Sequence, residues 1–239
     1  MSSENGIKTN VLVAVVGTGS IGTRHLKALA NAPDASPIAV PRRAERATEL
    51  TAQGITTAST LVEAVDLGAS LGLIATETDR HFDDSIAALE LGLDLLVEKP
   101  MAINGKQALE LKTRAKELGR SVYVACVLRF SGSLNAFKRM LPELDNVHSV
   151  RIEGQSYLPD WQPERDYLES FRAHKNGGGV LLDLIHEIDY AGWILGWPQS
   201  VQAKVVNTGR LKIEADEAAH LIWESPEGYI VSLTIDFLS

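Results

Sequence analysis

Residues 11–22 read VLVAVVGTGSIG, an apolar run that leads directly into three glycines with the spacing G-x-G-x-x-G. The β-branched stretch Val11–Val16 predicts a buried parallel strand, and the apolar spacing of Ile21–Asn31 predicts a helix behind the glycines. A second strand is expected at Pro37–Val40. Strand, glycine turn, helix and strand in this order indicate the start of a doubly wound α/β sheet.

The same alternation continues to Cys126. We expect further buried strands at Leu71–Ala75, Leu93–Val97 and Ser121–Ala125. Further helices are expected at Ala44–Ala52, Phe82–Leu91 and Gln107–Leu118. Near-continuous apolar strands between helices predict a parallel sheet that is covered on both faces. Residues 1–126 are therefore expected to form a Rossmann domain.

The pattern changes after Cys126. Strands now follow one another with short turns, and the polar, aromatic stretch Tyr157–Phe171 has no clear period. The expected elements are strands at Val147–Glu153, Val201–Asn207, Ala218–Glu224 and Tyr229–Phe237, a helix at Asn135–Leu141, and a helix from the glycine run Gly177–Gly179 to Leu195. This predicts a second domain, residues 127–239, of α+β type with a mostly antiparallel sheet.

Composition excludes several classes of protein. The formal net charge of −8 argues against nucleic-acid binding, which favours a basic surface. One cysteine, Cys126, allows neither an internal disulfide nor a cysteine-based zinc site, and no metal is expected. The polar N-terminus resembles no apolar leader, and no run approaches the roughly 18 apolar residues of a membrane span. A reducing cytoplasm is the expected compartment.

The glycine turn predicts a dinucleotide site. Gly17 permits the tight turn, Gly19 lets a pyrophosphate approach the backbone, and Gly22 lets the helix pack on the strand. Ser20 and Ile21 open the helix, whose N–H groups attract phosphate. The alternative is a purely structural turn.

The end of the second strand favours NADP(H) over NAD(H). An NAD site has an acidic residue about 20 residues beyond the glycines, which binds the ribose 2′-hydroxyl. Here Arg42 and Arg43 stand in its place, and guanidinium groups suit a 2′-phosphate. NAD(H) stays open, because two solvated arginines at a helix start would look the same.

Glu98-Lys99-Pro100 follows an expected strand, so Lys99 is placed at the carboxyl edge, where such sheets bind ligands. Lys99 could hydrogen-bond a substrate hydroxyl or assist proton transfer. Thr76, which follows the preceding strand, and Glu98 are also expected to contact the cofactor. The alternative for Lys99 is a surface lysine paired with Glu98.

The expected helix after the glycine run is apolar except for a few polar residues, among them Asp183, His186 and Asp189. Asp183 and His186 are three residues apart and would share a helical face. Histidine is suited to accept the proton of a hydroxyl as hydride leaves its carbon. The alternative is a structural Asp–His pair.

Together, the segments Gly17–Gly22, Glu98-Lys99-Pro100 and Gly177–Gly179 with the Asp183/His186 helix resemble the Gfo/Idh/MocA oxidoreductases. The resemblance implies a Rossmann domain, a second domain with a large sheet that mediates homo-oligomer contacts, and sugar-like substrates. It also implies that Lys99, His186 and Asp183 are the catalytic and substrate-contacting residues. A cis peptide bond is expected at Lys99–Pro100.

Two departures from the family pattern accompany this resemblance. Residues 126–130 read CVLRF, where many members have an asparagine. The chain also ends at Ser239, earlier than the family pattern, which implies an incomplete second sheet. A non-catalytic dinucleotide- or sugar-binding sensor on the same fold is the alternative function.

Overall fold

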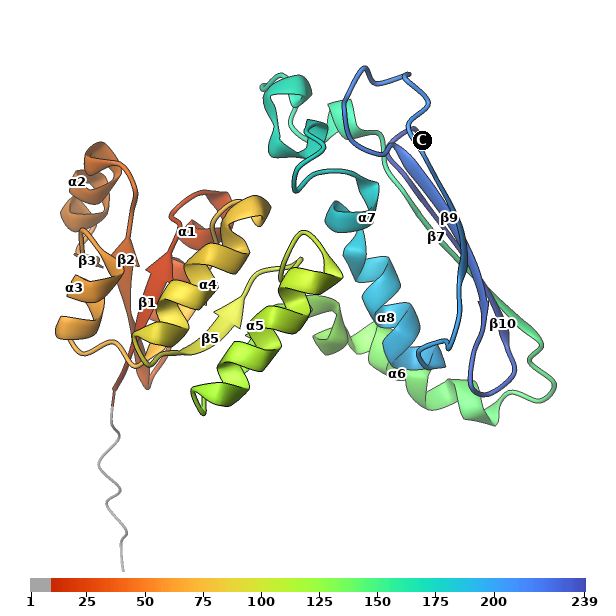
Figure 1. The fold of residues 1–239 in the computed structure, drawn as a ribbon, viewed down its shortest axis with the longest axis horizontal. Helices are drawn as coiled ribbons and strands as arrows, with labels where there is room; N and C mark the ends of the chain where they lie inside the picture. The colour runs from red at the N-terminus through yellow and green to blue at the C-terminus, as the bar shows by residue number, and fades with distance from the viewer. Residues whose placement is uncertain (1–9) are drawn as a thin grey trace, which may run out of the picture. The chain divides into compact units, whose positions relative to one another are not determined.

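The apolar run near the start of the chain forms β1 (Val11–Val16), an inner strand of a sheet with the order β3-β2-β1-β4-β5-β6 (Figure 1). The computed structural model describes residues 10–239; the polar segment 1–9, in which no apolar leader is expected, lies outside the described residues. The chain divides into two compact units, the first ending at Ala125 and the second comprising Cys126–Ser239.

All strand pairings in the first unit are parallel, which confirms the predicted doubly wound sheet. Its other elements are α1 (Ser20–Ala30), β2 (Ala35–Val40), α2 (Ala44–Ala52), β3 (Thr56–Thr57), α3 (Leu61–Asp66), β4 (Leu71–Ile74), η1 (Thr78–Arg80), α4 (His81–Glu90), β5 (Asp94–Val97), α5 (Gly105–Glu117) and β6 (Val122–Val124). β3 and α3 fall in residues 53–70, where the sequence pattern predicts no element. Elements of two and six residues are too short to give a periodic signal.

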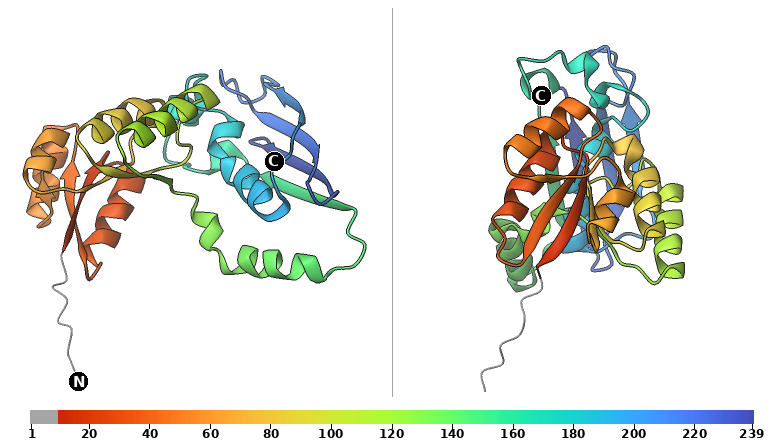
Figure 2. Two further views of the ribbon diagram at one scale, coloured as in Figure 1. Left: turned by 60° about the horizontal axis from the view of Figure 1, so that its bottom comes forward. Right: turned by 90° about the vertical axis from the view of Figure 1, so that its left-hand side faces the viewer.

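Helices cover both faces of this sheet (Figure 2). On one face, Leu26 of α1 and Leu50 of α2 are buried beside Val15 of β1. On the other face, Leu89 of α4 and Leu111 of α5 are buried against β5. The strand order reverses direction between β1 and β4, and sheets of this kind bind ligands at the carboxyl ends of the strands beside that point.

The second unit holds a four-stranded sheet with the order β7-β10-β9-β8. β7 pairs with β10 in parallel and the other pairings are antiparallel, which confirms the predicted mostly antiparallel sheet. Its elements are η2 (Val127–Phe130), α6 (Gly132–Met140), η3 (Leu141–Glu143), β7 (Ser149–Gln155), η4 (Leu158–Asp160), η5 (Tyr167–Glu169), η6 (Phe171–Ala173), α7 (Val180–Asp183), α8 (Ile185–Leu195), β8 (Gln202–Val206), β9 (Ala218–Glu224) and β10 (Ile230–Asp236).

The single helix expected between the glycine run and Leu195 is wrong in one respect. Leu184, with φ of −91° and ψ of 31°, interrupts it and separates α7 from α8. Asp183 and His186 therefore do not share a face of one continuous helix. The sequence did not predict this break, because the apolar pattern continues through Leu184. No helix within residues 10–239, α8 included, is long and apolar enough to cross a membrane.

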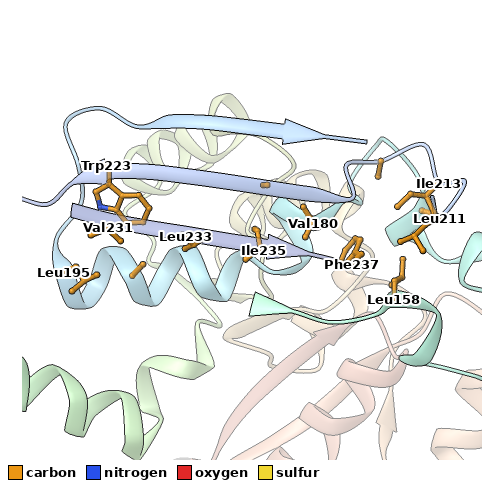
Figure 3. Close-up of a cluster of buried hydrophobic side chains, with 14 of the residues drawn as sticks. Leu158, Val180, Leu195, Leu211, Ile213, Trp223, Val231, Leu233, Ile235 and Phe237 are labelled. Atoms are coloured by element: carbon orange, nitrogen blue, oxygen red, sulfur yellow. The ribbon is translucent and has the colours of Figure 1, made fainter. Parts of the chain in front are cut away.

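The core of the second unit lies between α8 and one face of its sheet (Figure 3). Val231, Leu233 and Ile235 alternate along β10 and are all buried. Phe237, just after β10, is fully buried and packs edge-on against Trp161, with ring centroids 5.5 Å apart. This end of the sheet depends on Phe237 for its packing.

Phe237→Ala is expected to lower the free energy of unfolding of the second unit by about 3–5 kcal/mol, because it removes a buried ring and leaves a cavity. All four tryptophans, at positions 161, 193, 197 and 223, lie in this unit, so tryptophan fluorescence in urea follows its unfolding. Leu144→Ala, at an exposed position of the same unit, is the control and should change the free energy by less than about 0.5 kcal/mol. Equal effects of the two substitutions would contradict the assigned core.

Candidate active site

Three glycines shape the turn between β1 and α1, each in a different way. Gly17 has a φ of +91°, and a Cβ there would lie 2.5 Å from the carbonyl oxygen of Ala75. A Cβ on Gly22 would lie 2.0 Å from the carbonyl oxygen of Gly17. A Cβ on Gly19 would meet nothing within 4 Å. Two glycines therefore close the turn onto the end of β4, and the third leaves the backbone open to a ligand.

The turn also presents the donors that a pyrophosphate needs. Ser20 and Ile21 are exposed at the start of α1, and no side chain caps this helix. Uncapped first-turn N–H groups carry the positive end of the helix dipole. After β4, the hydroxyl oxygen of Thr76 is buried without a hydrogen-bond partner in the described part of the chain. These features, with the open Gly19, fit a dinucleotide.

Arg42 and Arg43 follow β2, whose carboxyl end lies beside that of β1. Both are exposed, and neither guanidinium has a hydrogen-bond or ion-pair partner within residues 10–239. Arg46, in the first turn of α2, donates from Nη2 to Oγ1 of Thr23 on α1 at 2.9 Å. Arg46 is not among the predicted site residues, because its position in sequence marks it only as a residue of the helix surface.

The carboxylate of Glu98, just after β5, is held by two groups of the first unit. Oε1 lies 2.7 Å from Nε2 of His25 on α1, and Oε2 accepts the backbone N–H of Lys99 at 3.1 Å. Burial raises the pKa of Glu98, but the hydrogen bonds from His25 and Lys99 outweigh it and keep the pKa below its usual value. Glu98 therefore fixes the turn that carries Lys99, and any cofactor contact would add to these bonds.

The predicted residues of the first unit meet at one edge of its sheet. Gly17, Thr76 and Glu98 follow β1, β4 and β5, which are neighbouring parallel strands. Lys99 is partly buried at this edge, and the peptide bond Lys99–Pro100 is cis, as the resemblance implies. An open glycine turn and a lysine thus stand at the ends of nearby strands.

In the second unit, Asp183 is buried and forms an ion pair with Arg172. Nε of Arg172 donates to Oδ2 of Asp183 at 2.6 Å. The guanidinium of Arg172 also lies over the rings of Phe171 and Trp161, 4.7 and 5.4 Å from their centroids. His186, half-buried, follows in the first turn of α8. Arg172 thus fixes the carboxylate that precedes His186 in the chain.

Asp189, also buried, is held by Arg129 through two hydrogen bonds of 2.9 and 2.6 Å. These bonds raise the pKa of Arg129 above its ordinary value. One turn after His186, burial and the nearby Glu187 raise the pKa of Tyr190. Neither Arg129 nor Arg172 is among the predicted site residues. The available signal was chemical, since a carboxylate in an apolar helix needs a cationic partner.

Close packing before α7 leaves no room for a side chain at Gly178 or Gly179. A Cβ on Gly178 would lie 2.4–2.6 Å from three carbonyl oxygens of residues 171–174. Gly179 has a φ of +93°, and a Cβ there would lie 2.5 Å from Oδ1 of Asp216. Asp216 in turn accepts the N–H groups of Val180 and Leu181, both at 3.0 Å, and so caps α7. These contacts bring Arg172 within reach of Asp183.

Glu98→Gln is expected to destabilise the first unit by about 1 kcal/mol near pH 6, because the ionised carboxylate is the better acceptor. The lowered pKa means that this stabilisation is present above the ordinary glutamate pKa and is lost as the pH falls through the folded-state value. The difference from wild type should therefore shrink and vanish as the pH falls below the folded-state pKa of Glu98. Urea unfolding followed by far-ultraviolet circular dichroism measures it, with Glu110→Gln, at an exposed site, as the control. A difference that is constant with pH would contradict this assignment.

Two family models match the sequence and together span most of it. Residues 11–126 match GFO_IDH_MocA, described as an oxidoreductase family with an NAD-binding Rossmann fold. Residues 142–239 match the GFO/IDH/MocA C-terminal domain.

Curated relatives agree with these matches. The rhizopine catabolism protein MocA of Rhizobium meliloti is 27% identical over 234 residues, which cover 92% of this chain and 69% of the relative. The myo-inositol dehydrogenase Hyg17 of Streptomyces leeuwenhoekii is 31% identical over 191 residues, 77% of this chain and 55% of the relative. The chain thus spans about half the length of that relative.

Solved structures share the fold. GenD2 from gentamicin A biosynthesis, in complex with NAD, superposes with a TM-score of 0.83 at 24% identity over 97% of this chain and 67% of that one. The WlbA dehydrogenase of Chromobacterium violaceum, in complex with NADH and UDP-GlcNAcA, gives 0.84 at 21% identity over 96% and 68%. The family matches and the relatives show that this chain belongs to the GFO/IDH/MocA family of oxidoreductases.

Proposed function

We propose that this protein is an NAD(P)-dependent oxidoreductase that transfers a hydride between a nicotinamide cofactor and the hydroxyl or ketone of a sugar, polyol or nucleotide sugar. The observation that carries the proposal is the open Gly19 turn at the same sheet edge as Lys99. A dinucleotide bound at the turn would run along the strand ends towards the lysine. The relatives named as inositol dehydrogenases support the substrate class.

The chain's own side chains would supply the proton transfer and the orientation of the substrate. A bound nicotinamide supplies the hydride donor or acceptor. Lys99 would donate a hydrogen bond to the reacting oxygen, and His186 would take the proton of the hydroxyl or return it to the ketone. Asp183, oriented by Arg172, would contact substrate hydroxyls. The proton roles of Lys99 and His186 could be exchanged without change to the overall reaction.

The two parts of the chain would have different roles. Residues 1–126 would bind the cofactor, and residues 127–239 would bind the substrate and form homo-oligomer contacts. Exposed apolar side chains on the sheet of the second unit support the proposal of homo-oligomer contacts. Ile222 and Ile230 lie on adjacent strands and are 46% and 44% exposed. A second copy of the chain would cover them.

NADP(H) is the proposed cofactor, because Arg42 and Arg43 are exposed and have no partner within the described residues 10–239, at the place where an NAD site carries an acid. Replacing Arg42 and Arg43 together by alanine is expected to weaken NADPH binding at least about tenfold, since each charge-assisted bond to a phosphate is worth about 1.5–3 kcal/mol. NADH binding should not change. Fluorescence titration with each cofactor measures both, with Lys112→Ala as the control for surface charge. Equal losses for the two cofactors would contradict the 2′-phosphate assignment.

Lys99→Met and His186→Gln are each expected to lower kcat by about 10²–10⁴-fold, because each removes a group that handles a proton. NADPH binding, measured by fluorescence, should stay within about threefold of wild type. The assay is NADPH formation or consumption with a panel of inositols, sugars and nucleotide sugars. A wild-type chain that binds NADPH and turns over none of these would favour a sensor over an enzyme.

A further inference from the structure

A buried histidine joins the two turns at the proposed cofactor edge. His81 opens α4 and is 2% exposed. Its Nδ1 lies 2.7 Å from the carbonyl oxygen of Pro100, and its Nε2 lies 3.0 Å from the carbonyl oxygen of Thr76. Thr76 follows β4 and Pro100 follows β5, so one side chain bridges the turns that leave two neighbouring strands.

Both partners of His81 are carbonyl oxygens, which only accept hydrogen bonds. Each ring nitrogen of His81 therefore faces a carbonyl acceptor within hydrogen-bond distance. A buried polar ring with two such bonds costs free energy if either is lost. A phenylalanine of similar shape would fill the space and make neither bond.

The turn that carries Lys99 is held at both of its ends. On one side, the carboxylate of Glu98 is bound by His25 of α1. On the other side, His81 of α4 binds the carbonyl of Pro100. Lys99 lies between these two anchors, and α1 and α4 come from opposite faces of the sheet. Neither His25 nor His81 is among the residues proposed to exchange a proton with substrate, which are Lys99 and His186.

We infer that His81 is a positioning residue, which locks the Lys99 turn to the Thr76 turn so that the lysine and the cofactor contact keep a fixed separation. The inference rests on the proposed role of Lys99. A displacement of about 1 Å in a reacting group can cost about 10²-fold in rate, so loss of the bridge should appear in kcat rather than in KM.

Three substitutions separate the two bonds. His81→Asn places an amide nitrogen near the position of Nδ1 and keeps the bond to Pro100. His81→Gln places it near Nε2 and keeps the bond to Thr76. His81→Phe keeps the volume and loses both bonds. The matched control is His148→Phe, at an exposed position of the second unit.

The expected result is a loss of about 10²-fold in kcat for His81→Phe, with KM and the Kd for NADPH within about threefold of wild type. His81→Asn should recover at least about tenfold of that loss, and His81→Gln should recover less, because only asparagine restores the bond at the Lys99 turn. Equal kcat values for the asparagine and glutamine variants, at equal folded fraction, overturn the inference. This comparison decides the question even where His81→Phe does not fold.

Amide hydrogen exchange in the NADPH complex gives a readout that does not need turnover. His81→Phe, or His81→Gln if the former does not fold, should speed exchange in residues 98–101, while the amides of β1 and β4 keep their wild-type rates. Unchanged exchange in that segment overturns the inference. A wild-type chain without turnover instead contradicts the proposed function, and the exchange data then still decide whether His81 holds the turn.

Discussion

The close approach of α1 to the end of β4 is the constraint on which the first unit depends. Gly22 sits against the carbonyl of Gly17, and Gly17 sits against the carbonyl of Ala75, at distances that leave no room for a Cβ. These contacts bring the N-terminus of α1 over the carboxyl edge of the sheet. Residues with no sequence proximity, among them Glu98 and His25, can then meet there.

In the second unit, buried ion pairs fix the positions of side chains from separate segments. A buried aspartate on each of α7 and α8 is paired with an arginine from an earlier segment, Arg172 for Asp183 and Arg129 for Asp189. Removing one partner of such a pair would leave an uncompensated buried charge. Because Asp216 caps α7 and restricts Gly179, the short helix has little freedom to carry Asp183 away from its arginine.

The sequence was sufficient for the parallel first sheet, the glycine turn and the lysine after β5, because each leaves a local pattern of apolar residues and turn residues. It was insufficient where a contact is long-range. His81 reads as an ordinary helix residue, and only the fold shows that Thr76 and Pro100 flank it. The helix break at Leu184 also leaves no mark in the sequence, since the apolar pattern is the same on either side of this residue.

The central claim is that the glycine turn binds a dinucleotide, and Gly19 offers a direct test. A Cβ on Gly19 would meet no atom of the described residues within 4 Å, so Gly19→Val should leave the thermal midpoint unchanged while it blocks the approach of a pyrophosphate. Gly105, the first residue of α5, is equally open and provides the control Gly105→Val. In fluorescence titrations we expect Gly19→Val to weaken NADPH and NADH binding at least about tenfold, with no effect of the control. Wild-type affinity in Gly19→Val would contradict the claim.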